Sequence, residues 1–121
     1  MPKKIVQVGV SLSDHANAKM EIRVKPWTVW TSDGDSIEWQ RVAINGQLKD
    51  RVKELKISTP QNPGVWPFSG AKPGKGPQPT TGARTPVQAP YTLPYTIEIT
   101  FFDEDGDERT AIVDPDMVID T

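Results

Sequence analysis

The chain has 121 residues and a formal net charge of −2, with twelve prolines, nine glycines, no cysteine and one histidine. This length fits a single domain over 1–121, and the many prolines and glycines, without sustained helical spacing of apolar residues, exclude a helical bundle. Without cysteine the chain can form neither a disulfide nor a thiolate metal site, which fits a reducing compartment.

The N-terminus lacks the long apolar run of a signal peptide, and no stretch is long enough to span a membrane. We therefore expect a cytoplasmic protein, unless a signal was removed. Residues 94–121 hold nine acidic residues against Arg109 alone. Such an acidic end would repel phosphates, so we expect no nucleic-acid partner there.

The first predicted strand covers residues 3–10, with Val6, Val8 and Val10 on one face. The polar residues 11–18 predict an irregular loop that contains His15, the sole histidine. A metal ligand or general base is one interpretation of His15. The other, which we favour, is an exposed loop residue, because no second histidine, cysteine or spaced carboxylate accompanies it.

The stretch 21–42 predicts a strand, a tight turn and a second strand. Ile22 and Val24 alternate with charged residues, and Pro26 predicts a bend or an edge position. The turn falls at 32–35, where Gly34 can adopt positive φ and Asp33 can bond its own backbone. Tryptophans on both strands are expected to anchor a small β core.

The next segment predicts a turn followed by a strand. Asn45-Gly46 is a strong hairpin signal, and residues 47–57 are expected to return mostly as a strand. The spacing of Leu48, Val52 and Leu55 leaves a short helix open as an alternative.

Residues 58–93 carry eight prolines and five glycines and predict a long Pro/Gly-rich loop inserted in the domain. We expect residues 65–68 to dock on the sandwich and residues 72–85, which lack an apolar anchor, to be mobile. Trp66 and Phe68 are either a cap on one end of the sandwich, which we favour, or a binding platform.

The closing part predicts a hairpin. Tyr95, Ile97, Ile99 and Phe101 alternate with polar residues, and an acidic Asp-Gly turn leads to a partner strand at 108–113. Asp114-Pro115 interrupts it before a last short strand at 117–119.

Two motifs resemble the cupredoxin family: Ile22-x-Val24-x-Pro26-Trp27-x-Val29, and Asp33-Gly34-Asp35-x-Ile37-x-Trp39. The closing hairpin is similar to that of small bacterial cupredoxin-like domains that lack copper. The resemblance implies an all-β fold, an antiparallel Greek-key β-sandwich of about seven strands.

Copper is excluded by ligand count, because a blue-copper centre takes two histidines, a cysteine and usually a methionine. In the family one histidine follows the Trp-ended strand and the other ligands lie between the last long strands. Residues 40–46 and 103–107 contain none of these residue types. We therefore expect no cofactor.

Asp103, Asp105 and Asp107 form a weak surface cation candidate, although the run departs from an EF-hand loop. No catalytic motif occurs, and the paired carboxylates lie in turns, so we expect no enzyme activity.

Two functions remain open at this point. The first is a copper-free interaction module whose exposed strand edges and 58–93 loop contact another protein or a second copy of itself. The alternative is a carbohydrate-binding module that uses Trp66, Phe68 and one of Trp27 or Trp30 as stacking faces.

Overall fold

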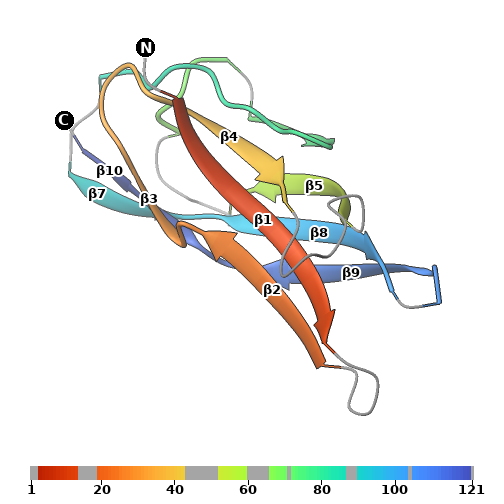
Figure 1. Cartoon of the computed structure of the whole chain (residues 1–121). Coiled ribbons are helices and arrows are strands. Elements are labelled where there is room, and N and C mark those ends of the chain that lie inside the picture. Colours follow the sequence, from red (N-terminus) through yellow and green to blue (C-terminus); the bar gives the residue numbers. More distant parts are fainter. Residues whose placement is uncertain are drawn as a thin grey trace.

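The computed structural model describes residues 3–13, 19–42, 52–59, 66–70, 72–86, 90–103 and 105–120, of which 11–13 and 19–21 are described for the backbone alone. In these ranges the chain forms ten strands and no helix, which confirms the predicted all-β class (Figure 1). The strands are β1 (Lys3–Ser13), β2 (Lys19–Lys25), β3 (Thr28–Thr31), β4 (Ser36–Arg41), β5 (Val52–Ser58), β6 (Lys75–Gly76), β7 (Tyr91–Pro94), β8 (Thr96–Phe102), β9 (Glu108–Val113) and β10 (Asp116–Ile119).

Three sheets are formed, in the strand orders β2-β1-β4, β3-β10-β7 and β6-β5-β8-β9. The pairings β1–β4 and β3–β10 are parallel and the others between named strands are antiparallel. The expectation of an antiparallel sandwich of about seven strands is therefore corrected: the described residues form ten strands, in two sheets that mix parallel and antiparallel pairings and a third that is antiparallel throughout. The strands beyond the expected number are β3, which a bend at 26–27 separates from β2, and β6 and β7, which overlap the segment 58–93 that the sequence predicts as a loop.

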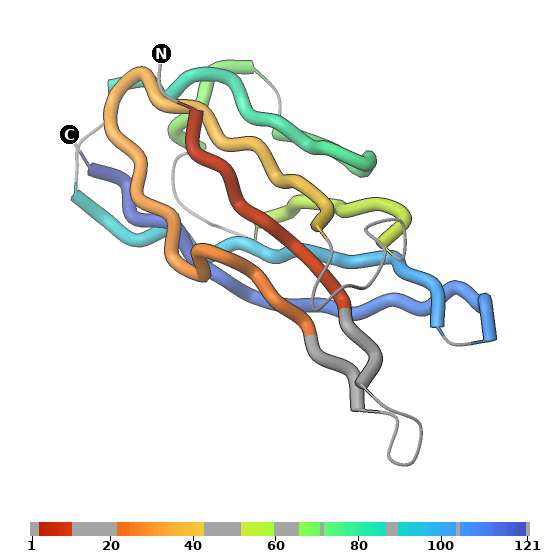
Figure 2. The backbone as a smooth tube through the Cα atoms, in the orientation of Figure 1, coloured from red at the N-terminus to blue at the C-terminus, as the bar shows by residue number. Residues whose placement is uncertain are grey.

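The second and third sheets are two halves of one layer. A single residue, Tyr95, separates β7 from β8, and Asp114 and Pro115 separate β9 from β10. The register of β8 with β9 continues through this gap, since the Tyr95 N–H donates to the Pro115 carbonyl at 3.1 Å. The hairpin predicted from the closing residues is thus a long ribbon, and β2-β1-β4 forms the opposite layer (Figure 2).

The predicted turn at 32–35 is confirmed, but it does not make a hairpin. The Asp35 N–H donates to the Ser32 carbonyl at 3.0 Å, and Gly34 has φ of 91°. The side chain that bonds the turn is that of Asp35, which accepts from the Ser32 N–H at 2.8 Å, rather than that of Asp33. Because β3 pairs with β10 and β4 pairs with β1, the turn carries the chain from one layer to the other.

The core lies between the two layers. Inward-facing residues alternate along the strands as the sequence predicts, and Val6, Val8, Ile97 and Ile99 are all fully buried. At the centre, Trp39 lies edge-on to Tyr95 with ring centroids 5.6 Å apart, and the indole N–H donates to the Tyr95 hydroxyl at 3.2 Å. Trp39 therefore anchors the core as expected, whereas Trp27 and Trp30 lie 49% and 59% exposed.

The Pro/Gly-rich segment closes one side of the sandwich, contrary to the expected mobility of residues 72–85. Residues 79–84 run antiparallel to β4: the Trp39 N–H donates to the Pro79 carbonyl at 2.9 Å and the Thr81 N–H to the Ile37 carbonyl at 2.8 Å. The short strand β6 pairs with β5 in the other layer. Backbone hydrogen bonds hold this segment in place although it lacks an apolar anchor. The hydropathy of the side chains does not indicate such bonds.

Residues 67–69 pair in turn with residues 83–85, which confirms that this part docks. The Ser69 N–H donates to the Ala83 carbonyl at 2.9 Å and the Thr85 N–H to the Pro67 carbonyl at 2.8 Å. The pairing is tight at Gly82, where a Cβ would collide with the Ser69 carbonyl and hydroxyl.

We expect Gly82→Ala to lower the free energy of unfolding by about 1–3 kcal/mol, because backbone at Ser69 must move. Gly74→Ala is the matched control, since a Cβ there meets nothing within 4 Å, and its effect should stay within about 0.5 kcal/mol. Urea denaturation followed by tryptophan fluorescence measures both. Equal midpoints for the two variants would contradict the close approach.

Some expectations concern residues outside the described ranges, namely His15, Asn45-Gly46 and Leu48. The predicted loop at 11–18 begins later than expected, because β1 continues to Ser13. Val52, Leu55 and Ile57 are buried on β5, which confirms a strand over the described part of 47–57.

Candidate functional site

The predicted platform of Trp66 and Phe68 has little exposed surface. The two ring centroids lie 5.1 Å apart and the planes are tilted by 52°. Phe68 is 4% exposed and belongs to the core, while Trp66 is partly buried against it and carries Lys72 Nζ 5.8 Å from its ring centroid. This geometry is that of a cap on the sandwich, and it leaves no pair of exposed faces on which a sugar could stack.

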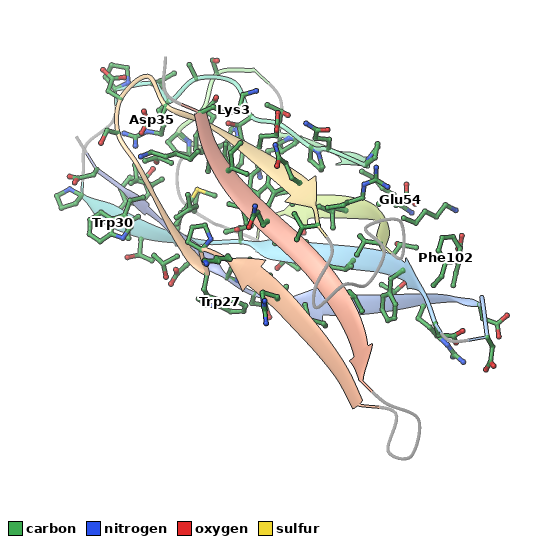
Figure 3. The ribbon with its side chains drawn as sticks, in the orientation of Figure 1. Lys3, Trp27, Trp30, Asp35, Glu54 and Phe102 are labelled. Carbon is green, nitrogen blue, oxygen red and sulfur yellow. The ribbon has the colours of Figure 1, made fainter. Side chains whose placement is uncertain are left out.

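Trp27 and Trp30 are the exposed aromatic candidates. Trp27 lies where β2 passes into β3, and Trp30 lies on β3 (Figure 3). In the parallel register of β3 with β10, Trp30 is level with Val118. The structure does not pair Trp66 with either of them through any described ring contact.

The side of the sandwich formed by β2 and β9 is open. Each of these strands ends its sheet, so each has one edge without a partner among the named strands. Of the six described hydrophobic residues that are only partly buried against the core, Ile22, Val24, Ala111 and Val113 lie on these two strands. Ile112 is 64% exposed on β9.

We call this surface the open side and define it by β2, β9 and Trp27. It contrasts with the opposite side, where residues 72–86 cover the edges of β4 and β5 and supply prolines that cannot donate to a further strand. Pairing of a strand with another chain is a known use of such uncovered edges.

The acidic turn brings its three predicted residues together. Carboxylate oxygens of Asp103, Asp105 and Asp107 lie within 4.8 Å of one another. Asp103, however, already accepts hydrogen bonds from the backbone N–H groups of Asp105 and Asp107 and from Arg109 Nε, at 2.8 to 3.0 Å. The hydrogen bond from Arg109 is the main reason that the pKa of Asp103 lies below its usual value. A cation would have to displace Arg109, so the weak site stays a prediction.

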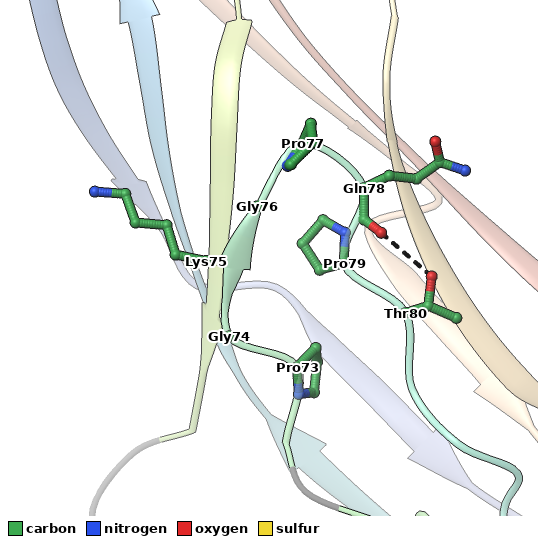
Figure 4. Close-up of a pocket in the computed structure, with 8 residues that line it drawn as sticks. All are labelled: Pro73, Gly74, Lys75, Gly76, Pro77, Gln78, Pro79 and Thr80. Carbon is green, nitrogen blue, oxygen red and sulfur yellow. Dashed lines mark hydrogen bonds between the residues drawn. The ribbon is translucent and has the colours of Figure 1, made fainter.

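A shallow hollow of about 330 Å³ lies within the Pro/Gly-rich segment, lined by residues 73–80 (Figure 4). Its lining includes prolines, glycines, Lys75, Gln78 and Thr80, but neither an aromatic ring nor a carboxylate. Lys75 is engaged by Glu54 at 3.2 Å. The hollow therefore offers no residue suited to proton transfer or stacking.

Glu38 is the most buried carboxylate with a perturbed pKa in the described part of the chain. It lies on the outer face of β4, 7% exposed, and accepts hydrogen bonds from Gln40 Nε2 at 2.5 Å and from Lys3 Nζ at 3.1 Å. The hydrogen bonds from Gln40 and then from Lys3 hold the pKa of Glu38 below its usual value, and Gln78 of the Pro/Gly-rich segment adds to this effect.

We expect Glu38 to make the fold sensitive to acid. Because its pKa is lower in the folded than in the unfolded chain, the carboxylate stabilises the fold above about pH 4.5, and this contribution is lost as the pH falls through the folded pKa. Urea midpoints at about pH 7 and about pH 3.5 should therefore differ less for Glu38→Gln than for the wild type. The same difference in both proteins would refute this role.

No model of a known protein family matches the chain, and no curated protein shows significant sequence similarity to it. In the described part of the chain, no helix is long and apolar enough to cross a membrane.

Sequence reasoning predicted contacts at exposed strand edges but did not identify β2 and β9 as the strands that carry them. The sequence shows that Ile22 and Val24 alternate with charged residues. This spacing is the same whether the strand lies inside a sheet or at an open edge, so it does not reveal the edge. Ile112 alone carries a local signal, since it is an apolar residue at an outward position of a strand.

Proposed function

We propose that this protein is a non-enzymatic, copper-free, cupredoxin-like module that acts in protein interaction or self-association. The fold part of the proposal is a Greek-key sandwich of the cupredoxin kind. It is supported by the two-layered arrangement of mixed sheets, with β1 central and parallel to β4, and by the motifs around Trp27 and Trp39.

The copper-free part of the proposal rests on residue types. Cysteine is absent from the sequence, and the turn between β8 and β9, where the family places most of its ligands, contains acidic residues and glycine. Carboxylates favour hard cations rather than copper bound through thiolate and imidazole.

The interaction part of the proposal rests on the open side. Two strand edges that have no partner among the described strands lie next to four partly buried hydrophobic residues and to the exposed Ile112 and Trp27. An uncovered edge with apolar residues can bind an extended strand through backbone hydrogen bonds, with side chains on alternate positions giving specificity.

Photo-crosslinking in the cells that make the protein tests this function. A photoreactive amino acid placed at Ile112 should yield specific protein products, and the same group at the exposed Thr92, on β7, should not. A product with another protein and a product with a second copy of the chain both count as interactions. The absence of any protein product at Ile112, or identical products at Thr92, would overturn the proposal.

A further inference from the structure

The backbone groups of β9 that point away from the sheet can be assigned from two hydrogen bonds. Tyr95 pairs with Pro115 and Asp103 pairs with Asp107, and both bonds continue the register of β8 with β9. Because bonded and non-bonded pairs alternate along an antiparallel ladder, the N–H and C=O groups of Thr110 and its neighbours two residues away, Glu108 and Ile112, point towards the open side.

The backbone groups of β2 that point away from β1 can be assigned from a hydrogen bond made by β1. The Val42 N–H donates to the Val8 carbonyl, so the peptide groups of Val8 point towards β4 and not towards β2. Val8 is level with Val24. By the same alternation, the N–H and C=O groups of Val24 and Ile22 point away from β1, towards the open side.

Strands β2 and β9 run in the same direction. Strand β2 continues into β3, β3 is parallel to β10, and β10 continues β9. A two-fold axis along this direction would place β2 of one copy parallel to β9 of a second copy, and β9 of the first beside β2 of the second. Because the axis exchanges the two layers, the layer that contains β2 in one copy would continue into the layer that contains β9 in the partner. The inner faces of these two layers would then form one continuous surface.

One register places hydrophobic residues on the same face, aligns the outward-pointing backbone groups of the two strands and pairs opposite charges. With Ile22 opposite the partner's Ala111, Val24 falls opposite the partner's Val113, and all four are inward-facing hydrophobic residues. In a parallel ladder Ile22 would then bond to the residues on either side of the partner's Ala111, whose groups point outward as derived above. The exposed Lys25 falls opposite the exposed, oppositely charged Asp114.

Charge explains why the partner strand is β2 and not a second β9. An antiparallel pair of two β9 strands would bring the acidic turn before one strand towards Asp114 and Asp116 after the other. Strand β2 instead carries the exposed cations Arg23 and Lys25. Isologous dimers with a two-fold axis are also the commonest closed assemblies.

We propose that two copies of this chain form a two-fold dimer through their open sides, with β2 of each copy parallel to β9 of the other and Lys25 facing the partner's Asp114. This inference rests on the proposed interaction function and names its partner. Trp27, two residues after Lys25, becomes covered at the end of the interface.

Analytical ultracentrifugation from about 1 to 500 µM tests the dimer. The wild type should dimerise, and Lys25→Glu, Asp114→Lys and Ile112→Lys should each weaken dimerisation at least about tenfold, while Lys25→Glu combined with Asp114→Lys restores it. Lys56→Glu is the matched control, because Lys56 is exposed on β5, away from the open side, and should leave the dimer unchanged.

A wild type that stays monomeric over this range, or a dimer that none of the three single changes weakens, would overturn the proposed dimer. So would a loss of dimer that the double exchange does not restore. A monomer that still crosslinks to another protein through Ile112 leaves the interaction function standing, whereas a monomer without crosslinks refutes both. Circular dichroism of each variant confirms that it is folded.

Discussion

Replacing Arg84 with alanine is expected to lower the free energy of unfolding by about 3 kcal/mol, the largest effect that we predict for a single polar side chain. For a domain of this size the melting temperature should fall by about 12 °C. The reason is that Arg84 is a buried arginine whose guanidinium group joins three separate parts of the chain.

Arg84 lies in the Pro/Gly-rich segment and is 3% exposed. Its Nη1 donates to the Thr31 carbonyl at 2.7 Å and to the Thr31 hydroxyl at 3.0 Å, and its Nη2 donates to the Asp120 carbonyl at 2.7 Å. Its backbone also pairs with Asp35, through a bond from the Arg84 N–H at 2.6 Å. The residue thereby holds residues 79–86, the end of β3 and the residue after β10 together.

The alanine variant would remove these charged hydrogen bonds and leave a cavity. The Asp120 carbonyl would lose its bond from Arg84, whereas the Thr31 carbonyl would keep a bond from the Asp120 N–H at 2.9 Å. Arg84 Nε is buried without a hydrogen-bond partner in the described structure. The free-energy cost of burying this group offsets part of the stabilisation that the other hydrogen bonds of Arg84 provide. The expected net loss is therefore smaller than the sum of three charged hydrogen bonds.

Arg109→Ala is the control for this prediction. Arg109 donates to the Asp103 carboxylate, but its side chain is 63% exposed, and exposed ion pairs stabilise proteins by about 1 kcal/mol or less. Thermal unfolding followed by circular dichroism compares the two variants. A fall in melting temperature for Arg84→Ala no larger than that for Arg109→Ala would refute the joining role.

The role of Arg84 could not be predicted from the sequence, whereas the strands could. Alternating apolar residues such as Ile97 and Ile99 identify a strand directly, because burial on one face leaves a period of two. The partners of the Arg84 guanidinium are two backbone carbonyls, which every residue has, and one threonine hydroxyl, so no residue type at a fixed spacing predicts these contacts. The same reason explains why residues 72–85 were expected to be mobile.

The sequence also does not show to which layer each strand belongs. The residues around the turn at 32–35 have the pattern of a hairpin, and a turn signal reports a reversal of the chain without reporting which strands it joins. The parallel pairings of β3 and β4 with distant strands depend on the whole fold. For this reason the burial of Trp39 could be predicted, but the exposure of Trp30, on the strand before the turn, could not.

The second large effect is expected at Trp39. Trp39→Phe should lower the free energy of unfolding by about 2–3 kcal/mol, because the smaller ring leaves a cavity at a fully buried position and the hydrogen bond to Tyr95 is lost. Tyr95→Phe should cost less, about 1–2 kcal/mol, because it leaves the Trp39 N–H without an acceptor but keeps the ring packing.

A double-mutant cycle measures the contact itself. The variant with both changes should be more stable than the sum of the single effects predicts, by about 1 kcal/mol, because each single change already breaks the same hydrogen bond. Burial also raises the pKa of Tyr95 to about 12. Since the unfolded chain ionises this phenol at a lower pH, the fold loses stability as the pH rises above about 10, and Tyr95→Phe should remove that loss. Strictly additive effects, together with an unchanged alkaline dependence in Tyr95→Phe, would contradict a buried hydrogen-bonded pair between Trp39 and Tyr95 at the centre of the sandwich.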